Sequence, residues 1–271
     1  DETMTNDIVD TGCVSMAYET VQLNDGSLPI LTPMSEVAGR MSVQNGAKCL
    51  EGSMGGKGKL LGGVPGVNRA KVTVIGGGTV GTNAAKLASG LGAEVYILDI
   101  DMERLRYLDD VMPSNVTTLY SNSHNINELI LETDLLIGAV LIPGKKAPKI
   151  ITKDLISKMQ KGSVIVDVAV DQGGCVETCK PTTHQDPTYI VDDIVHYCVA
   201  NMPGAVPHTS TLALTNVTLP YIKILSENST KECINNNLPL KLGLNTFKGH
   251  VTHKGVADSF NLNYSDPLSL L

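Results

Sequence analysis

Three glycines and one aspartate carry the clearest chemical signal in this chain. Gly76, Gly78 and Gly81 form a G-x-G-x-x-G pattern directly after the β-branched run at residues 72–75, and Asp99 follows 18 residues after Gly81. The first glycine permits a tight turn, the second lets the backbone approach a pyrophosphate, and the third allows close packing of helix and strand. An acid at the end of the next strand can accept hydrogen bonds from both ribose hydroxyls of an adenosine. The unit therefore predicts dinucleotide binding.

The same aspartate favours NAD over NADP as the cofactor. A carboxylate at Asp99 repels the 2′-phosphate of NADP. Arg104, five residues further on, leaves two alternatives open: it faces a phosphate, or it lies along the adenine or pairs with a neighbouring acid, which we favour. An ordinary glycine-rich corner is the competing interpretation of the whole unit. The complete order of strand, turn, helix, strand and acid argues against it.

Polar residues follow two later strand candidates. Asp171 and Gln172 follow the apolar run at residues 164–170 and precede two glycines, while Asn201 and Met202 follow the run at 194–199. Ligands of parallel sheets bind beyond the carboxyl ends of the strands, so these segments are candidate sites. The alternative is that they are merely turns, because Asp favours turns through local hydrogen bonds.

The elements that must position these residues alternate along the chain. Strand-like runs at 72–75, 95–98, 116–120, 135–140, 164–170 and 194–199 are separated by helix-like stretches. Such alternation predicts an α/β fold with a doubly wound parallel sheet, the Rossmann arrangement. We expect a NAD-binding domain over residues 30–208. Residues 1–29, with a strand at 14–21, and residues 209–271 should form an incomplete second α/β domain, and Ser35 is expected to cap a helix that ends near Cys49.

Composition narrows the function further. The chain has 271 residues and a net charge of −7, which argues against a nucleic-acid partner. No run of 18 apolar residues is present, so we expect no membrane span. The six scattered cysteines are interpreted as small buried hydrophobes of a reducing compartment. Cys175, Cys179 and His184 lack a second ligand pair, so we expect no metal site.

Several longer motifs resemble one enzyme family, alanine dehydrogenase. They are YETV at 18–21, PMSEVAGR at 33–40, GGVPG at 62–66, GAVLIPG at 138–144, AVDQGG at 169–174, YCVANMP at 197–203 and TSTLALTN at 209–216. The resemblance extends from about residue 12 to about residue 265. The related proton-translocating transhydrogenase shares the nucleotide corner and a Gln-Gly-Gly turn, but not the Asn-Met-Pro stretch.

The resemblance implies reversible oxidative deamination, in which L-alanine, NAD and water give pyruvate, ammonia and NADH. It implies that Asp171 is the catalytic aspartate and that Asn201 and Met202 lie by the nicotinamide. The other cofactor contacts that it implies are Ser35, Gly76, Gly78, Thr79, Val80, Gly81, Asp99, Arg104, Ser121 and Val140. It also implies a homo-oligomer, a hexamer, in the cytoplasm.

The family's catalytic histidine and the lysine and arginine that bind the substrate carboxylate belong to an N-terminal part, and this chain starts after it. None of His124, His184, His196, His208, His250 or His253 lies in a matching motif. We therefore expect an N-terminally truncated member whose given part alone is inactive. The alternatives are a NAD(H)-binding homologue without catalysis and a transhydrogenase-like NAD(H)-binding component.

Overall fold

The computed structural model describes residues 1–141 and 147–271, so Ile142, Pro143 and Gly144 of the GAVLIPG motif lie outside the described residues. The chain divides into two compact units. One joins Asp1–Met34 to Pro207–Leu271, and the other is Ser35–Val206. The larger unit contains the alternating stretch of the sequence. The assignment of NAD binding to this unit and of substrate chemistry to the other stays a prediction.

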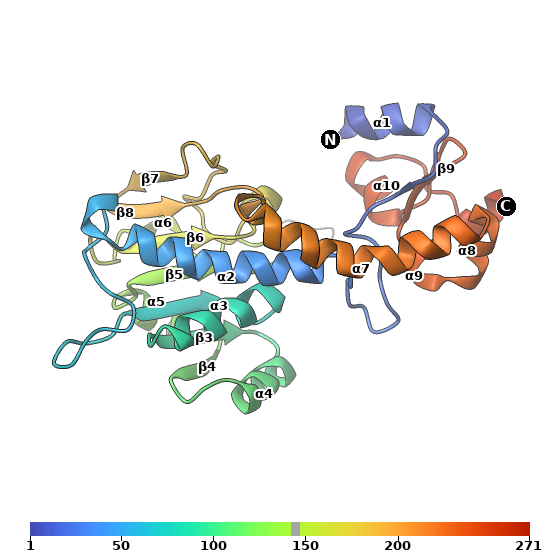
Figure 1. Ribbon diagram of the computed structural model, residues 1–271. Helices are drawn as coiled ribbons and strands as arrows, with labels where there is room; N and C mark the ends of the chain where they lie inside the picture. Colours follow the sequence, from blue (N-terminus) through green and yellow to red (C-terminus); the bar gives the residue numbers. More distant parts are fainter. Residues whose placement is uncertain (142–146) are drawn as a thin grey trace. The chain divides into compact units, whose positions relative to one another are not determined.

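A seven-stranded sheet forms the centre of the Ser35–Val206 unit, in the order β4-β3-β2-β5-β6-β8-β7 (Figure 1). Adjacent strands are parallel except β7 and β8, which form an antiparallel pair at one edge. The chain runs outward from β2 to β4 and then returns to the other side of β2, so the order switches between β2 and β5. The strands are β2 (Lys71–Ile75), β3 (Glu94–Asp99), β4 (Val116–Tyr120), β5 (Leu135–Gly138), β6 (Val164–Asp167), β7 (Thr188–Val191) and β8 (Ile194–Tyr197).

Helices cover both faces of this sheet because consecutive strand residues point in opposite directions. Leu135 faces α2 (Thr32–Cys49), where a Cβ on Gly46 would lie 2.6 Å from a Leu135 methyl. Leu136 belongs instead to the cluster that contains residues of α5 (Ser123–Ile130) and α6 (Lys153–Ile156). The remaining helices of the unit are α3 (Thr79–Gly90) and α4 (Met102–Val111). The doubly wound α/β prediction is therefore confirmed.

Some predicted element ends were wrong. Ser35 lies inside α2 rather than at its N-cap, because the helix already begins at Thr32 with Pro33 in its first turn. Proline is well placed there, since its missing N–H has no helical acceptor to lose. Strand β6 ends at Asp167, and a short 3₁₀ helix, η2 (Val170–Gln172), replaces the predicted continuation to residue 170.

The second unit brings the two ends of the chain together. Strand β1 (Ser15–Met16), much shorter than the predicted strand at 14–21, pairs antiparallel with β9 (Leu244–Phe247), which also pairs with β10 (His250–Val251). The unit's helices are α1 (Glu2–Asp10), α7 (Pro207–Glu227), α8 (Thr230–Asn236), α9 (Leu238–Leu242) and α10 (Lys254–Phe260). Among the described residues, no helix is long and apolar enough to cross a membrane.

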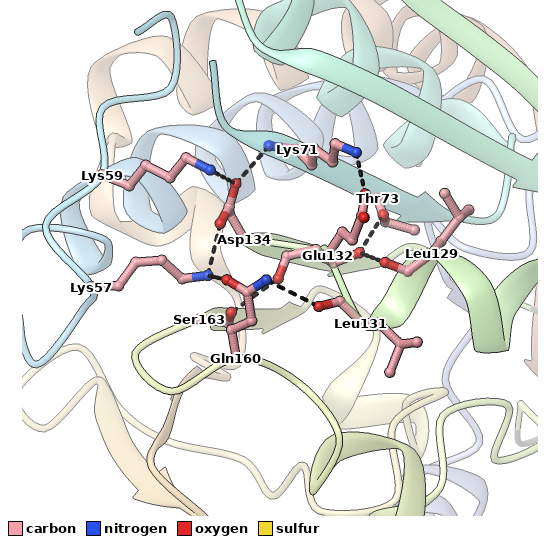
Figure 2. A network of polar contacts seen from close by, with 11 residues as sticks. Lys57, Lys59, Lys71, Thr73, Leu129, Leu131, Glu132, Asp134, Gln160 and Ser163 are labelled. Carbon is pink, nitrogen blue, oxygen red and sulfur yellow. Dashed lines mark hydrogen bonds and ion pairs between the residues drawn. The ribbon is translucent and has the colours of Figure 1, made fainter. Parts of the chain in front are cut away.

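A buried carboxylate organises the amino edge of the sheet (Figure 2). The Asp134 side chain, 1% exposed, forms ion pairs of 2.7 Å with both Lys57 and Lys59. It also accepts the backbone N–H of Lys71, the first residue of β2, at 2.8 Å. Burial alone would raise the pKa of Asp134, but hydrogen bonds from the two lysines hold that pKa below its ordinary value. The network thus fixes the segment at residues 57–59 to the start of β2 and β5.

Candidate functional site at the carboxyl edge of the sheet

The residues that the sequence singled out lie at the carboxyl ends of the parallel strands, opposite to the end where Asp134 lies. Ile75 is in register with Leu98 of β3 and with Gly138 of β5, and Gly138 is in register with Asp167 of β6. The ladder continues past Ile75, because Gly76 donates its N–H to the Leu98 carbonyl at 2.8 Å. The glycine turn, the end of β3 and the segments after β5 and β6 therefore lie along one edge, next to the switch point where doubly wound sheets bind ligands.

The glycine turn has the shape that its sequence predicts. Gly76 adopts a φ of +102°, which favours glycine. A Cβ on Gly81 would lie 1.8 Å from the Gly76 carbonyl oxygen, so only glycine lets α3 pack against the turn. Gly78 is different, because it is exposed and a Cβ there would meet nothing within 4 Å. The space above Gly78 is thus open to an approaching ligand.

The first turn of α3 offers unpaired donors to an anion. Its first backbone hydrogen bond runs from the Thr82 N–H to the Gly78 carbonyl at 2.9 Å. The N–H groups of Thr79, Val80 and Gly81 precede it and have no acceptor within the helix. Together with the partial positive charge of a helix N-terminus, they form a binding site suited to phosphate.

Asp99 and Arg104 support this turn. The Asp99 carboxylate accepts the N–H of Gly77 at 2.6 Å and that of Asp101 at 2.9 Å. The Arg104 guanidinium donates to the Gly77 carbonyl at 2.6 Å and to the Thr82 hydroxyl at 2.7 Å. In the described part of the chain Arg104 makes these contacts and no ion pair with an acid, and its contact with the cofactor stays a prediction. A carboxylate oxygen can accept further hydrogen bonds, so Asp99 keeps capacity for a ribose.

Three other candidate contacts surround the turn. Val140 follows β5, and its Cγ2 lies 3.2 Å from the position of a Cβ on Gly76. Ser121 donates its backbone N–H to the Asp99 carbonyl at 2.9 Å. Ser35 lies one helical turn before Gly39, where a Cβ would come within 2.2 Å of the Val80 carbonyl oxygen. Helix α2 thus brings Ser35 toward the start of α3.

The candidate residues beyond β6 and β8 lie on neighbouring strand ends, since these two strands pair directly. Asp171 is exposed within η2. Asn201 adopts a left-handed conformation with φ +56° and ψ +53°, which asparagine tolerates better than most other non-glycine residues. Met202 is only 2% exposed. The side chain of Met202 is therefore largely enclosed by protein.

Sequence reasoning missed two charged residues that form hydrogen bonds with the segment around Asp171. Asp167 is fully buried at the end of β6, and burial raises its pKa to about 6 despite hydrogen bonds from the Val176 and Ala169 N–H groups. Its position after three apolar residues parallels that of Asp99 and was a usable signal. Lys149 donates to carbonyl groups 24 to 27 residues away in sequence, so no local pattern could reveal it.

The cysteines form no metal centre in the described part of the chain, where no group of three potential ligands was found. Cys49, Cys175, Cys198 and Cys233 are buried, Cys179 is half-buried and Cys13 is exposed. Burial raises the pKa of Cys175 to about 12, so its thiol stays protonated. The interpretation as small buried hydrophobes thus describes four of the six.

Comparisons with known proteins point in the same direction. Residues 42–254 match the family model described as alanine dehydrogenase/PNT, C-terminal domain. Alanine dehydrogenase 2 of Staphylococcus aureus (strain USA300) is 59% identical over 265 residues, which are 97% of this chain and 71% of that protein. Alanine dehydrogenase of Staphylococcus haemolyticus (strain JCSC1435) is also 59% identical, over 98% of this chain and 71% of its own length.

Solved structures give the same picture. An L-alanine dehydrogenase structure matches with a TM-score of 0.91 and 53% identity, covering 96% of this chain and 72% of that one. A transhydrogenase from Sinorhizobium meliloti matches with a TM-score of 0.76 and 21% identity, covering 94% of this chain and 70% of that one. At that identity the second match shows a shared fold.

Proposed function

The chain belongs to the alanine dehydrogenase/PNT family, and we propose that it functions in the reversible oxidative deamination of L-alanine to pyruvate and ammonium with NAD as the hydride acceptor. The observation that best supports this proposal is the 59% identity to a named alanine dehydrogenase over 97% of the chain. The alternatives, a non-catalytic NAD(H)-binding homologue and a transhydrogenase-like component, are not favoured, because the relatives at 59% identity are named alanine dehydrogenases and the transhydrogenase match is only 21% identical.

The residues at the carboxyl edge of the sheet fit NAD. The open space above Gly78 and the free N–H groups of Thr79, Val80 and Gly81 suit its pyrophosphate. We assign Asp99 to the adenosine ribose. The further assigned contacts are Ser35, Gly76, Arg104, Ser121, Val140, Asn201 and Met202. When bound, NAD supplies the electrophilic carbon that accepts the hydride.

The chemistry asks the protein to move protons around the substrate. The alanine amine must lose a proton before the Cα hydrogen leaves as hydride, which produces an imine. Water then adds to the imine carbon, and the C–N bond breaks to give pyruvate and ammonia. We assign Asp171 to this acid–base work, because it is an exposed carboxylate beyond β6, next to the strand end that carries Asn201.

We further propose that the protein is a cytoplasmic homo-oligomer, a hexamer by its resemblance to the family. Two observations support this proposal. Leu212, Leu219 and Ile222 of α7 are spaced to lie on one face of the helix and are each more than 45% exposed, and an exposed apolar patch of this kind often marks a protein–protein interface. All six cysteines, each at a described position, are unpaired, as is typical of reducing compartments. Light scattering on the intact protein, by which we mean the full-length gene product, tests whether its mass is a multiple of the mass of one protomer.

The proposed activity is tested by NADH formation from L-alanine and NAD in the intact protein. NADP in place of NAD, and glycine or L-glutamate in place of L-alanine, are the matched comparisons. We expect turnover with L-alanine and NAD and a much lower rate with each replacement. Binding of NADH without turnover of L-alanine would support the non-catalytic alternative instead.

A further inference from the structure

The segment that carries Asp171 is irregular and needs support from outside itself. Residues 168–176 leave β6, form η2 and turn through Gly173 and Gly174, whose φ angles are +99° and +59°. Buried N–H and C=O groups of such a segment must find partners, because leaving them unpaired is costly. Two charged side chains supply many of these partners.

Asp167 binds the N–H groups of the loop from the inside. Its carboxylate accepts from the Ala169 N–H at 3.2 Å and from the Val176 N–H at 3.1 Å, so one buried group joins both ends of the loop. A Cβ on Gly174 would lie 2.3 Å from the same carboxylate. Glycine at this position therefore lets the chain pass directly over Asp167.

Lys149 binds the C=O groups of the same loop from the exposed side. Its ammonium donates to the carbonyl of Gly173, to that of Gly174 at 3.2 Å and to that of Val176 at 3.1 Å. Its own backbone is anchored alongside, because Ile150 and Ile151 both donate to the Cys175 carbonyl, at 2.8 and 3.1 Å. The ammonium thus uses all three of its donors on one short stretch.

We infer that Lys149 and Asp167 are positioning residues, which hold the loop bearing Asp171 by its carbonyl groups on one side and its N–H groups on the other. This inference rests on the proposed function, because it concerns the placement of the proposed acid–base residue. Asp171 is itself exposed, so packing does little to fix it. A displacement of about 1 Å at a catalytic group can cost about 100-fold in rate, so the two anchors matter for turnover.

The test is a graded series at Lys149 in the intact enzyme. Lys149→Arg keeps a cation with several donors, Lys149→Gln keeps a short neutral donor, and Lys149→Met keeps only the length of the side chain. We expect kcat to fall in that order, with a loss of about 10-fold to 100-fold for Lys149→Met. The dissociation constant of NADH should stay within about twofold, because none of the proposed cofactor contacts is altered.

Lys158→Met is the matched control. Lys158 is an exposed lysine whose ammonium pairs at 2.6 Å with Asp154 of α6, a residue outside the loop. It should keep the kcat of the unchanged enzyme. Hydrogen exchange of the amides at residues 171–176 should be faster in Lys149→Met and unchanged in the control.

The possible outcomes are distinguishable. An unchanged enzyme that does not oxidise L-alanine refutes the proposed function. An active enzyme whose Lys149→Met variant keeps full kcat, or loses only NADH affinity, refutes the positioning role. If Lys149→Met does not fold, the Arg and Gln variants still decide, because equal kcat values in both and in the unchanged enzyme contradict the inference.

Discussion

At the residue scale, Asp99 has two tasks that can be separated. Its carboxylate orders the glycine turn by accepting the N–H of Gly77 at 2.6 Å, and its negative charge faces the position assigned to the ribose. The single oxygen of an amide side chain can still accept the Gly77 hydrogen bond, but the amide carries no charge and loses the hydrogen bond from the Asp101 N–H. Asp99→Asn therefore tests the charge while the turn keeps its bond to Gly77.

We expect Asp99→Asn to bind NAD about tenfold more weakly, since a hydrogen bond to a charged group contributes about 1.5–3 kcal/mol. The preference for NAD over NADP should fall, because the repulsion of the 2′-phosphate is lost. Titration calorimetry with both cofactors measures this. Asp110→Asn, an exposed acid on α4, is the control. An unchanged ratio of the two affinities would show that Asp99 does not select the cofactor.

The raised pKa of Asp167 should make the free energy of unfolding depend on pH. Burial raises its pKa to about 6 from an ordinary value of 3.8, with Lys149 and the Cys175 thiol as its charged and titratable neighbours. The folded state therefore holds this proton more tightly than the unfolded state does. The contribution of Asp167 to the free energy of unfolding is largest below pH ~4 and falls as the pH rises to ~6.

The measurement is urea unfolding of the unchanged protein and of Asp167→Asn at several values between pH 4 and pH 7. Relative to the variant, the unchanged protein should lose of the order of 3 kcal/mol across this window. A difference between the two proteins that does not vary with pH would mean that Asp167 titrates as it does in the unfolded chain.

At the element scale, the glycines of the β2–α3 corner separate packing from ligand approach. Gly81→Ala places a Cβ 1.8 Å from the Gly76 carbonyl oxygen, so both stability and NADH affinity should fall. Gly78→Ala meets nothing within 4 Å, so stability should be kept while NADH affinity falls about tenfold or more. Gly90→Ala, at the open end of α3, is the control and should stabilise by about 0.4–1 kcal/mol.

Thermal unfolding and NADH titration of the three alanine variants measure these effects. The informative variant is Gly78→Ala. If it binds NADH as tightly as the unchanged protein, the pyrophosphate does not lie over Gly78 and the assigned cofactor position is wrong.

The amino edge of the sheet depends on Asp134 (Figure 2). Asp134→Asn leaves Lys57 and Lys59 without their buried partner, and we expect a loss of about 3 kcal/mol in the free energy of unfolding. Because its pKa is lowered in the folded state, the contribution of Asp134 is present at neutral pH and disappears as the pH falls below about 4.

Urea unfolding at pH 7 and at pH 3 tests this, with Glu132→Gln as the control. Glu132 pairs with Lys71 in the same network but is 64% exposed, so its loss should change little. Equal effects of the two substitutions would show that burial of Asp134 does not strengthen its ion pairs.

The strands could be predicted from sequence because buried parallel strands are short β-branched runs. The ends of the elements could not. Strand β6 ends at Asp167 because this side chain captures the N–H of Ala169, a contact that no pattern of apolar residues reveals. Likewise, Ser35 was predicted to be a helix cap, yet α2 already begins at Thr32, with Pro33 in its first turn. The local backbone structure was predicted correctly where a single residue type determines it, as at Gly76 and Gly81.

At the scale of the whole molecule, the order of elements predicted which segments share an edge of the sheet. Alternating strands and helices imply a parallel sheet, and its carboxyl edge collects Gly78, Asp99 and the segment with Asp171. The role of Lys149 could not be predicted from the sequence, because its three acceptors lie more than twenty residues further along the chain. Of the two charges proposed to hold the loop with Asp171, Asp167 thus had a usable signal in the sequence, whereas Lys149 could be found only in the structure.

The most direct test of the account is Asp171→Asn in the intact protein. NADH formation from L-alanine and NAD gives kcat, and titration calorimetry gives NADH affinity. Loss of a general acid–base group lowers rates by about 10²–10⁴-fold, so we predict a fall in kcat of that size with NADH affinity unchanged. A variant that oxidises L-alanine at the unchanged rate would contradict the account, since Asp171 would then only form a turn.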